Sequence, residues 1–300
     1  MKTKQVVLSL ITNDNDFQRE QAVAAEEVAR RLDVNLRILY ADNDAVTQSS
    51  QLLKIIQSPQ RDADAIIVEP AGGTALPQVA HAAVKAGIGW VLLNREADYV
   101  DSLRAAHKTP VFSVSGDHEE IGRIQAAQFA ALLPLGGSVL YIQGPSNSTV
   151  AKQRTSGLQG ALKANIHLKI LRSATWTETH GYQAIESWLR LSTSRREAID
   201  VVSGQNDNIA MGARKAFHEL CGEADWERWS KTSFTGVDGL AGTGQAWVSK
   251  GLLAATVVVP PNSAPALEML VQALNAERQP PALTLVHPAS FPELKSLVRK

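Results

Sequence analysis

The sequence predicts an α/β fold with two similar lobes, each built on a doubly wound parallel sheet. Three observations support this prediction. Short apolar runs alternate with helical patterns almost from end to end, and this alternation is typical of βαβ units, whose helices cover both faces of a parallel sheet. The series of units begins twice, in stretches of about equal size. The chain then returns late to the first series, so we expect several chain crossings between the lobes.

The first series is predicted from apolar runs bounded by small or polar residues and from apolar residues at helical spacing. Strands are predicted at 6–12, 35–40, 63–68, 90–93 and 111–114, and helices at 17–32, 46–57 and 76–85.

The second series follows the same rules. Helices are predicted at 119–133, 150–163, 179–191, about 207–220, 245–250 and 263–275, and strands at 138–143, 168–172, 199–202, 233–237, 253–259 and 283–287. Pro260-Pro261 ends one of these strands, because proline cannot donate to the hydrogen-bond ladder. A short helix is predicted in the tail at 291–300.

The stretch 199–213 is the centre of the functional argument. A buried strand is followed by Ser203-Gly204, by Gln205-Asn206-Asp207 and then by a helical pattern. We expect Asp207 or Asn208 to cap the helix, since a short side-chain oxygen accepts the free N–H groups of a first turn. Ligands of open α/β sheets lie beyond the carboxyl ends of the strands, so two amides and a carboxylate are expected where they can grip a polar molecule.

Composition excludes several classes of function. Thirty basic residues balance thirty acidic ones, so no basic field attracts nucleic acid or anionic lipid. The single cysteine, Cys221, cannot form an internal disulfide. No apolar run approaches the roughly 18 residues of a membrane span, and the N-terminus shows no signal-peptide pattern.

Polar and aromatic residues recur where the predicted strands end. They are Asn13, Asp14, Asn15, Asp16, Phe17, Gln18, Glu69, Asn94, Arg95, Arg154, Trp176, Asn206 and Asp238. Any one of them is explained by a loop cap or a surface charge. Carboxylates, amides and guanidinium groups together match the paired donors and acceptors of vicinal hydroxyls, and an aromatic ring covers the C–H face of a sugar.

Motifs for catalysis and cofactor binding are absent from the sequence. It contains no GxxxxGK[ST], GxGxxG, HExxH or GxSxG pattern, and its histidines show no metal-ligand spacing. We therefore expect no enzyme activity, no cofactor and no metal. An acid–base enzyme stays open as an alternative, because Asp238, Glu69 and two arginines lie at strand ends.

Taken together, the fragments VVLSLITNDNDF, ADAIIVEP, WVLLNRE, VSGDHEEIG, SVLYIQGPSNSTVAKQRTSGL, SGQNDNIAMGA and FTGVDGLAGTGQAWVSKGLLAATVVVP resemble the type I periplasmic sugar-binding proteins, the ribose-binding group in particular. That fold is shared with the effector-binding cores of lac repressor-type regulators. The resemblance covers nearly the whole chain. It implies one lobe at 1–115 plus 260–283 and another at 116–259 plus 284–300, joined by a three-segment hinge, with the ligand cleft between them.

The resemblance also implies the ligand contacts and their roles. Phe17 and Trp176 would sandwich a sugar ring, and hydrogen bonds to hydroxyls would come from Asn15, Asn94, Arg95, Arg154, Asn206 and Asp238. The sequence departs from the ribose pattern at several positions: Gln18 and Val237 replace phenylalanines, Asn94 an aspartate, Glu69 an asparagine and Val259 a glutamine. We hypothesise that Glu69 faces the ligand and favours another sugar or polyol, including one with an amine.

The expected function is capture of a monosaccharide or related polyol by hinge closure, for ABC-type uptake or sensing. The partners implied are an ABC permease or a sensory receptor, with no nucleic acid, no membrane insertion and a monomeric chain. The alternative is the effector-binding core of a lac repressor-type regulator without its DNA-binding domain. The resemblance implies a periplasmic location if a signal peptide has been removed, and a native start at Met1 implies a cytoplasmic one.

Overall fold

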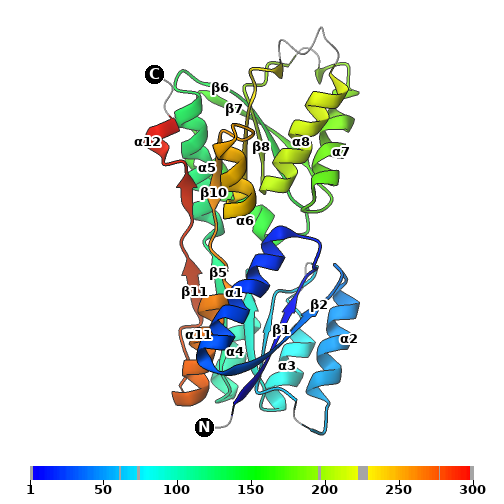
Figure 1. The fold of residues 1–300 in the computed structure, drawn as a ribbon, viewed down its shortest axis with the longest axis vertical. Coiled ribbons are helices and arrows are strands. Elements are labelled where there is room, and N and C mark those ends of the chain that lie inside the picture. The colour runs from blue at the N-terminus through cyan, green and yellow to red at the C-terminus, as the bar shows by residue number, and fades with distance from the viewer. Residues whose placement is uncertain are drawn as a thin grey trace. The chain divides into compact units, whose positions relative to one another are not determined.

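The computed structural model describes residues 3–60, 62–72, 75–194, 197–221, 229–276 and 278–297. The chain divides into two compact units, 1–116 with 261–286 and 117–260 with 287–300. It therefore passes between the units three times, after Gly116, Pro260 and Val286. In Figure 1 the first unit runs from blue to cyan and regains the orange-to-red segment of residues 261–286, and the second runs from green through yellow to gold and ends in the red C-terminal segment.

The first unit contains a six-stranded sheet in which every pairing is parallel. Its strands are β1 (Lys4–Leu10), β2 (Val34–Tyr40), β3 (Ala65–Val68), β4 (Gly89–Leu93), β5 (Val111–Gly116) and β11 (Leu283–Val286). Their order across the sheet is β11-β5-β4-β3-β1-β2. The central strands β3 and β4 are buried along their whole length, as expected for a sheet covered on both faces.

Helices cover both faces of this sheet. They are α1 (Asp16–Leu32), α2 (Ala45–Ile56), α3 (Pro77–Lys85), α4 (Tyr99–Ala106) and α11 (Ser263–Ala276). One apolar cluster joins α2, α3 and α4 to the face that carries Ile66 and Trp90. The other joins α1 and α11 to the face that carries Ile67 and Phe112. The late return of the chain through α11 thus completes the core of the first unit.

The second unit repeats this plan with one antiparallel edge. Its strands are β6 (Gly137–Gln143), β7 (Ile166–Arg172), β8 (Val201–Gly204), β9 (Ser233–Asp238), β10 (Ala255–Val258) and β12 (Ala289–Phe291). The order is β12-β10-β9-β8-β6-β7. Only β12 runs antiparallel to its neighbour, β10, and the other pairings are parallel.

The helices of the second unit again lie on both faces of its sheet. They are α5 (His118–Leu132), α6 (Thr149–Ala161), α7 (Glu178–Leu189), α8 (Asp207–Leu220), the wide turn η2 (Ala241–Gln245), α10 (Ala246–Ser249) and α12 (Leu294–Leu297). An apolar cluster around Trp188 and Phe217 joins α7 and α8 to one face. A cluster around Phe129 and Tyr141 joins α5 and α6 to the other.

The predicted fold class is confirmed, with most boundaries shifted by one or two residues. Helix α4 was not expected, because its sequence offers only two buried apolar residues, Val100 and Leu103. The tail contains strand β12 before the short helix α12, and residues 298–300 lie outside the described part of the chain. Within the described residues, no helix is both long and apolar enough to cross a bilayer.

Glycines allow helices α5 and α6 of the second unit to pack backbone against backbone. A Cβ added to Gly157 on α6 would lie 2.0 Å from the carbonyl oxygen of Glu119 on α5, and one added to Gly122 would lie 2.1 Å from that of Arg154. The close approach of α6 to α5 therefore depends on the missing side chains. Gly160, near the end of α6, has no atom within 4 Å of its added Cβ.

We expect Gly157→Ala to lower the free energy of unfolding by about 1–3 kcal/mol, because the added methyl group forces the two helix backbones apart. Gly160→Ala is the matched control on the same helix. It should be neutral or raise the free energy of unfolding by up to about 1 kcal/mol, since alanine favours a helix over glycine. Urea unfolding of the three proteins measures both changes, and equal effects of the two substitutions would contradict the packing argument.

Candidate functional site

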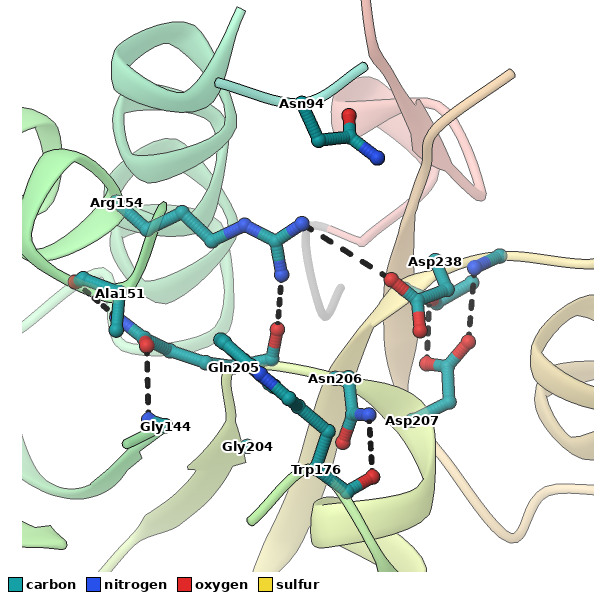
Figure 2. Close-up of polar contacts among 12 residues, drawn as sticks. Asn94, Gly144, Ala151, Arg154, Trp176, Gly204, Gln205, Asn206, Asp207 and Asp238 are labelled. Atoms are coloured by element: carbon teal, nitrogen blue, oxygen red, sulfur yellow. Dashed lines mark hydrogen bonds and ion pairs between the residues drawn. The ribbon is translucent and has the colours of Figure 1, made fainter. Parts of the chain in front are cut away.

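Four adjacent strands of the second unit carry four predicted binding residues at their carboxyl ends. Arg154 lies on α6 after β6, Trp176 follows β7, Asn206 follows β8, and Asp238 is the last residue of β9. The carboxyl ends of adjacent parallel strands meet at one edge of a sheet. The structure therefore brings these four residues together within the second unit, as Figure 2 shows.

Arg154 is the centre of this group. Its side chain is buried, with 6% exposed, and one guanidinium nitrogen, Nη2, lies 4.0 Å from Oδ1 of Asp238. The other, Nη1, donates a hydrogen bond to the carbonyl oxygen of Gln205. The guanidinium carbon also lies 5.7 Å from the centre of the Trp176 ring, within the range of a cation–π contact. The guanidinium group is thus held in one orientation by contacts on different sides.

The half-buried Trp176 is held by its backbone and by a glycine. Its carbonyl oxygen accepts a hydrogen bond of 2.8 Å from Nδ2 of Asn206. A Cβ added to Gly144 would lie only 2.3 Å from the Trp176 ring. The ring therefore packs directly on the backbone of the β6–α6 loop, in a space that no larger residue would leave open.

Asn206, and not Asp207 or Asn208, caps helix α8, so the expected cap is wrong by one residue. Oδ1 of Asn206 accepts a 2.8 Å hydrogen bond from the N–H of Ile209, while the backbone of Asn206 is extended. The reason is positional: the side chain of the residue before the first helical residue reaches the free N–H groups of the first turn. The same amide also donates to the Trp176 carbonyl, so Asn206 links the two loops.

The expectation that Gln205 grips a ligand is wrong. Its side chain is fully buried. Nε2 donates to the Tyr141 hydroxyl at 2.8 Å, the Ala151 carbonyl at 2.9 Å and the Thr155 hydroxyl at 3.0 Å. Oε1 accepts from the N–H of Gly144 at 2.9 Å. Gln205 therefore joins the end of β8 to strand β6, to the β6–α6 loop and to helix α6.

Two carboxyl groups, those of Asp238 and Asp207, lie close together at the end of strand β9. Asp238 has φ 103°, which is strained for a residue with a side chain, and 14% of its side chain is exposed. Asp207 is only 3% exposed. Burial, and then the nearby charge of Asp238, raises the pKa of Asp207 well above its ordinary value. Burial likewise raises the pKa of the Tyr141 hydroxyl.

In the first unit, predicted residues that follow strands β1 and β3 are linked by hydrogen bonds. Asn15 caps α1, with Oδ1 accepting from the N–H of Gln18 at 3.2 Å. Gln18 is buried, and its Nε2 donates to Oε2 of the buried Glu69 at 2.9 Å. Oε1 of Gln18 accepts from the N–H of Ile11 at 3.0 Å. Phe17 lies beside them in the first turn of α1 and is half-buried.

The residues after β4 extend this edge of the first unit. Asn94 is 4% exposed and has the left-handed value φ 54°, which asparagine tolerates better than most residues. Arg95 donates from Nη1 to the Asn94 carbonyl at 2.8 Å. Nδ2 of Asn262, just before α11, donates to Oδ1 of Asn94. Asn262 was not among the residues predicted from the sequence, because no pattern near Pro260-Pro261 pointed to it.

Each unit thus presents guanidinium, carboxylate, amide and aromatic groups from the ends of adjacent strands. These groups suit a small, neutral molecule with several hydroxyls, because every hydroxyl both donates and accepts. Among the described residues, no three His, Cys, Asp or Glu side chains form a group that could hold a metal ion.

Comparisons with known proteins agree on the type of protein. The family model described as "Periplasmic binding protein domain" matches residues 6–278. A putative rhizopine-binding protein of Rhizobium meliloti is 29% identical over 213 residues, which cover 69% of this chain and 65% of the relative. The ribose import binding protein of Bacillus subtilis is 25% identical over 213 residues, covering 70% of this chain and 64% of the relative. Both alignments span less than two thirds of the relative.

The fold also matches a solved structure over almost its full length. A periplasmic solute-binding protein of an ABC transporter from Actinobacillus succinogenes, with bound D-allose, superposes with a TM-score of 0.83. The two chains are 23% identical, and the match covers 98% of this chain and 99% of that one. This likeness establishes the fold. Because the family model covers most of the sequence, the chain belongs to the periplasmic binding protein domain family.

Proposed function

We propose that this protein is a solute-binding protein for a monosaccharide or a related polyol. The observation that carries the proposal is the group formed by Arg154, Trp176 and Asp238. A buried guanidinium group lies beside an aromatic ring and a carboxylate at the edge of a parallel sheet. This combination offers directed donors, an acceptor and a flat apolar surface to one small ring.

The names of the relatives support the same ligand class. The relative from Bacillus subtilis is a ribose import binding protein, and the structure from Actinobacillus succinogenes holds D-allose. For the site of this chain we propose the ten residues Asn15, Phe17, Gln18, Glu69, Asn94, Arg95, Arg154, Trp176, Asn206 and Asp238. We also propose that both units contribute to one cleft, with lobes at 1–115 plus 260–283 and 116–259 plus 284–300.

Hinge closure is the proposed mechanism. A ligand shifts a protein toward a closed state only by binding that state more tightly than the open one. Contacts from both units provide this difference, because they exist together only when the units close. Rejection of a ligand that lacks one hydroxyl follows from the buried polar group left unpaired, at a cost of about 1–3 kcal/mol.

We propose that the ligand is released unchanged, because the sequence contains none of the nucleophile motifs considered above and the described residues include no group of side chains that could hold a metal ion. The proposed partner is an ABC-type permease or a sensory receptor, the proposed location is the periplasm, and the proposed form is a monomer. Recovery of each bound sugar by mass spectrometry tests the first point, and turnover of any ligand would contradict it.

The function is tested by a thermal-shift screen of the purified chain against D-ribose, D-allose, xylitol, myo-inositol, amino sugars and nucleosides. A ligand at about 100 times its dissociation constant adds roughly 2.7 kcal/mol to the free energy of unfolding. For a chain of this size, we expect the melting temperature to rise by at least a couple of degrees. If no sugar or polyol raises it, the proposed ligand class is wrong and an effector-sensing role becomes the better account.

Trp176 should contribute about tenfold to affinity for the ligand that the screen identifies, since an aromatic contact adds about 0.5–1.5 kcal/mol beyond area burial. Trp176→Leu removes the ring. Gly144→Ala displaces it without altering Trp176, because the new Cβ would overlap the ring. Isothermal titration calorimetry should therefore show a similar loss for both variants.

Gly160→Ala provides the control for the glycine substitution, because its added Cβ meets nothing within 4 Å. This variant should bind as the unmodified protein does. Full affinity in Gly144→Ala would mean that the position of the Trp176 ring does not matter for binding.

Glu69 is expected to determine the choice between ligands. The buried carboxylate accepts from Gln18, and a carboxylate binds a protonated amine more strongly than a hydroxyl. Glu69→Gln should therefore weaken amino sugars more than their parent sugars. Matched pairs such as D-glucosamine and D-glucose, measured by the same thermal shift, compare the two effects.

Glu27→Gln, an exposed position on α1, makes the same change in net charge away from the predicted contacts. It should leave the order of ligands unchanged. If Glu69→Gln also leaves that order unchanged, Glu69 does not face the ligand.

A further inference from the structure

Asp207 accepts hydrogen bonds that join three segments of the second unit. It is the first residue of α8. Its Oδ2 accepts from the backbone N–H of Gly239 at 2.8 Å, and its Oδ1 accepts from the Thr256 hydroxyl of β10 at 2.7 Å. Figure 2 shows the Asp207 carboxyl group next to Asp238, with dashed lines that mark its two hydrogen bonds. The cap of α8 is provided by Asn206, so the Asp207 side chain is not needed for that purpose.

Glycines leave room for this carboxyl group. A Cβ added to Gly236 would lie 2.1 Å from Oδ1 of Asp207, and one added to Gly244 would lie 2.0 Å from Oδ2. Gly239, the donor to Oδ2, is the third glycine around it. The carboxyl group therefore occupies a space that exists because Gly236 and Gly244 lack side chains.

The peptide between Asp238 and Gly239 is held on several sides. Asp238 has φ 103° and Gly239 has φ 58°, so the chain turns sharply at the end of β9. Asp207 accepts from the Gly239 N–H, Gln245 donates from Nε2 to the Gly239 carbonyl at 2.7 Å, and Val259 donates to the Asp238 carbonyl at 3.0 Å. A strained backbone persists only where its surroundings fix it.

We propose that Asp207 is a positioning residue that acts through Asp238: by fixing the Gly239 amide, it aims the Asp238 carboxylate at Arg154 and at the ligand. This proposal rests on the proposed function, because it assigns Asp207 a part in the same binding site. Asp207 itself is buried and does not touch the ligand. Its burial raises its pKa, in keeping with a group that is enclosed by protein.

The chemistry of the two donors predicts which substitution preserves the turn. The Gly239 N–H can only donate, so it needs an oxygen at position 207. The Thr256 hydroxyl can rotate and accept instead. Asp207→Asn can therefore present its oxygen to Gly239 and its amide to Thr256, whereas Asp207→Ala leaves the Gly239 N–H without its acceptor.

The experiment is a double-mutant cycle with D-ribose, D-allose, xylitol and myo-inositol as probes, measured by calorimetry. Asp207→Ala should lower affinity for the binding probe by about tenfold or more, as expected when a hydrogen bond to a charged group is lost. Asp207→Asn should stay within about threefold. In an Asp238→Ala background, Asp207→Ala should have no further effect on affinity, because residues that act through one another are not additive.

Asp44→Ala serves as the control for lost stability. Asp44 caps helix α2 in the first unit, so its removal destabilises a helix and should leave affinity unchanged. If Asp207→Ala lowers affinity by the same factor with and without Asp238, the role is merely structural and the proposal is overturned. If Asp207→Ala does not fold, Asp207→Ser replaces it in the cycle, because a serine hydroxyl is too short to reach the Gly239 amide.

A second readout needs no ligand and separates failure of this inference from failure of the proposed function. Amide hydrogen exchange followed by NMR should show the Gly239 N–H protected in the unmodified protein and in Asp207→Asn, and exchanging at least tenfold faster in Asp207→Ala. An unchanged Gly239 rate overturns the inference whether or not any probe binds. Absence of binding by all four probes, with the expected change at Gly239, contradicts only the proposed ligand class.

Discussion

The parallel arrangement of neighbouring strands is the constraint on which the rest of the structure depends. Each strand of a βαβ series must start at the same edge of its sheet and end at the other, so the loops that follow adjacent strands meet. The loops after β6, β7, β8 and β9 consequently bring Arg154, Trp176, Asn206 and Asp238 together, although these residues span more than eighty positions of the chain. The order β4-β3-β1 does the same for the first unit.

The residues at these edges are held by a second set of side chains, which are themselves buried. Gln205 joins the β6–α6 loop to the core of the second unit through the Tyr141 hydroxyl and the Gly144 amide. Asp207 joins the turn after β9 to β10. Buried polar groups stabilise a structure only when their hydrogen-bond partners are in place. If one of these loops moves, the loops joined to it through Gln205 or Asp207 therefore also lose hydrogen bonds. The side chains of the proposed site are therefore held in place by the protein itself.

Strand ends could be predicted from the sequence because the hydrophobic runs that precede them are strong local signals. Asn94 and Asp238 were located in this way. The contacts that hold these positions could not be predicted, because Asn262 meets Asn94 across 168 positions of the chain and Asp207 meets Gly239, the residue after Asp238, across 32. Strand β12 escaped prediction for a related reason: its three residues become a strand by pairing with β10, not by any periodicity of their own. The local hydrophobic pattern thus locates the polar residues at the strand ends, whereas tertiary contacts decide which partners these residues have.

Asn94 and Asp238 have positive φ values, and this has an evolutionary consequence. A side chain branched at Cβ is disfavoured in such a conformation, so few residue types are tolerated at either position without loss of stability. Glu69 and Arg95 are not among the residues with positive φ. The backbone at positions 69 and 95 therefore allows a wider range of side chains. Divergence toward new ligands should therefore proceed first through Glu69 and Arg95, while positions 94 and 238 should alternate only among residues such as asparagine and aspartate, which tolerate a positive φ.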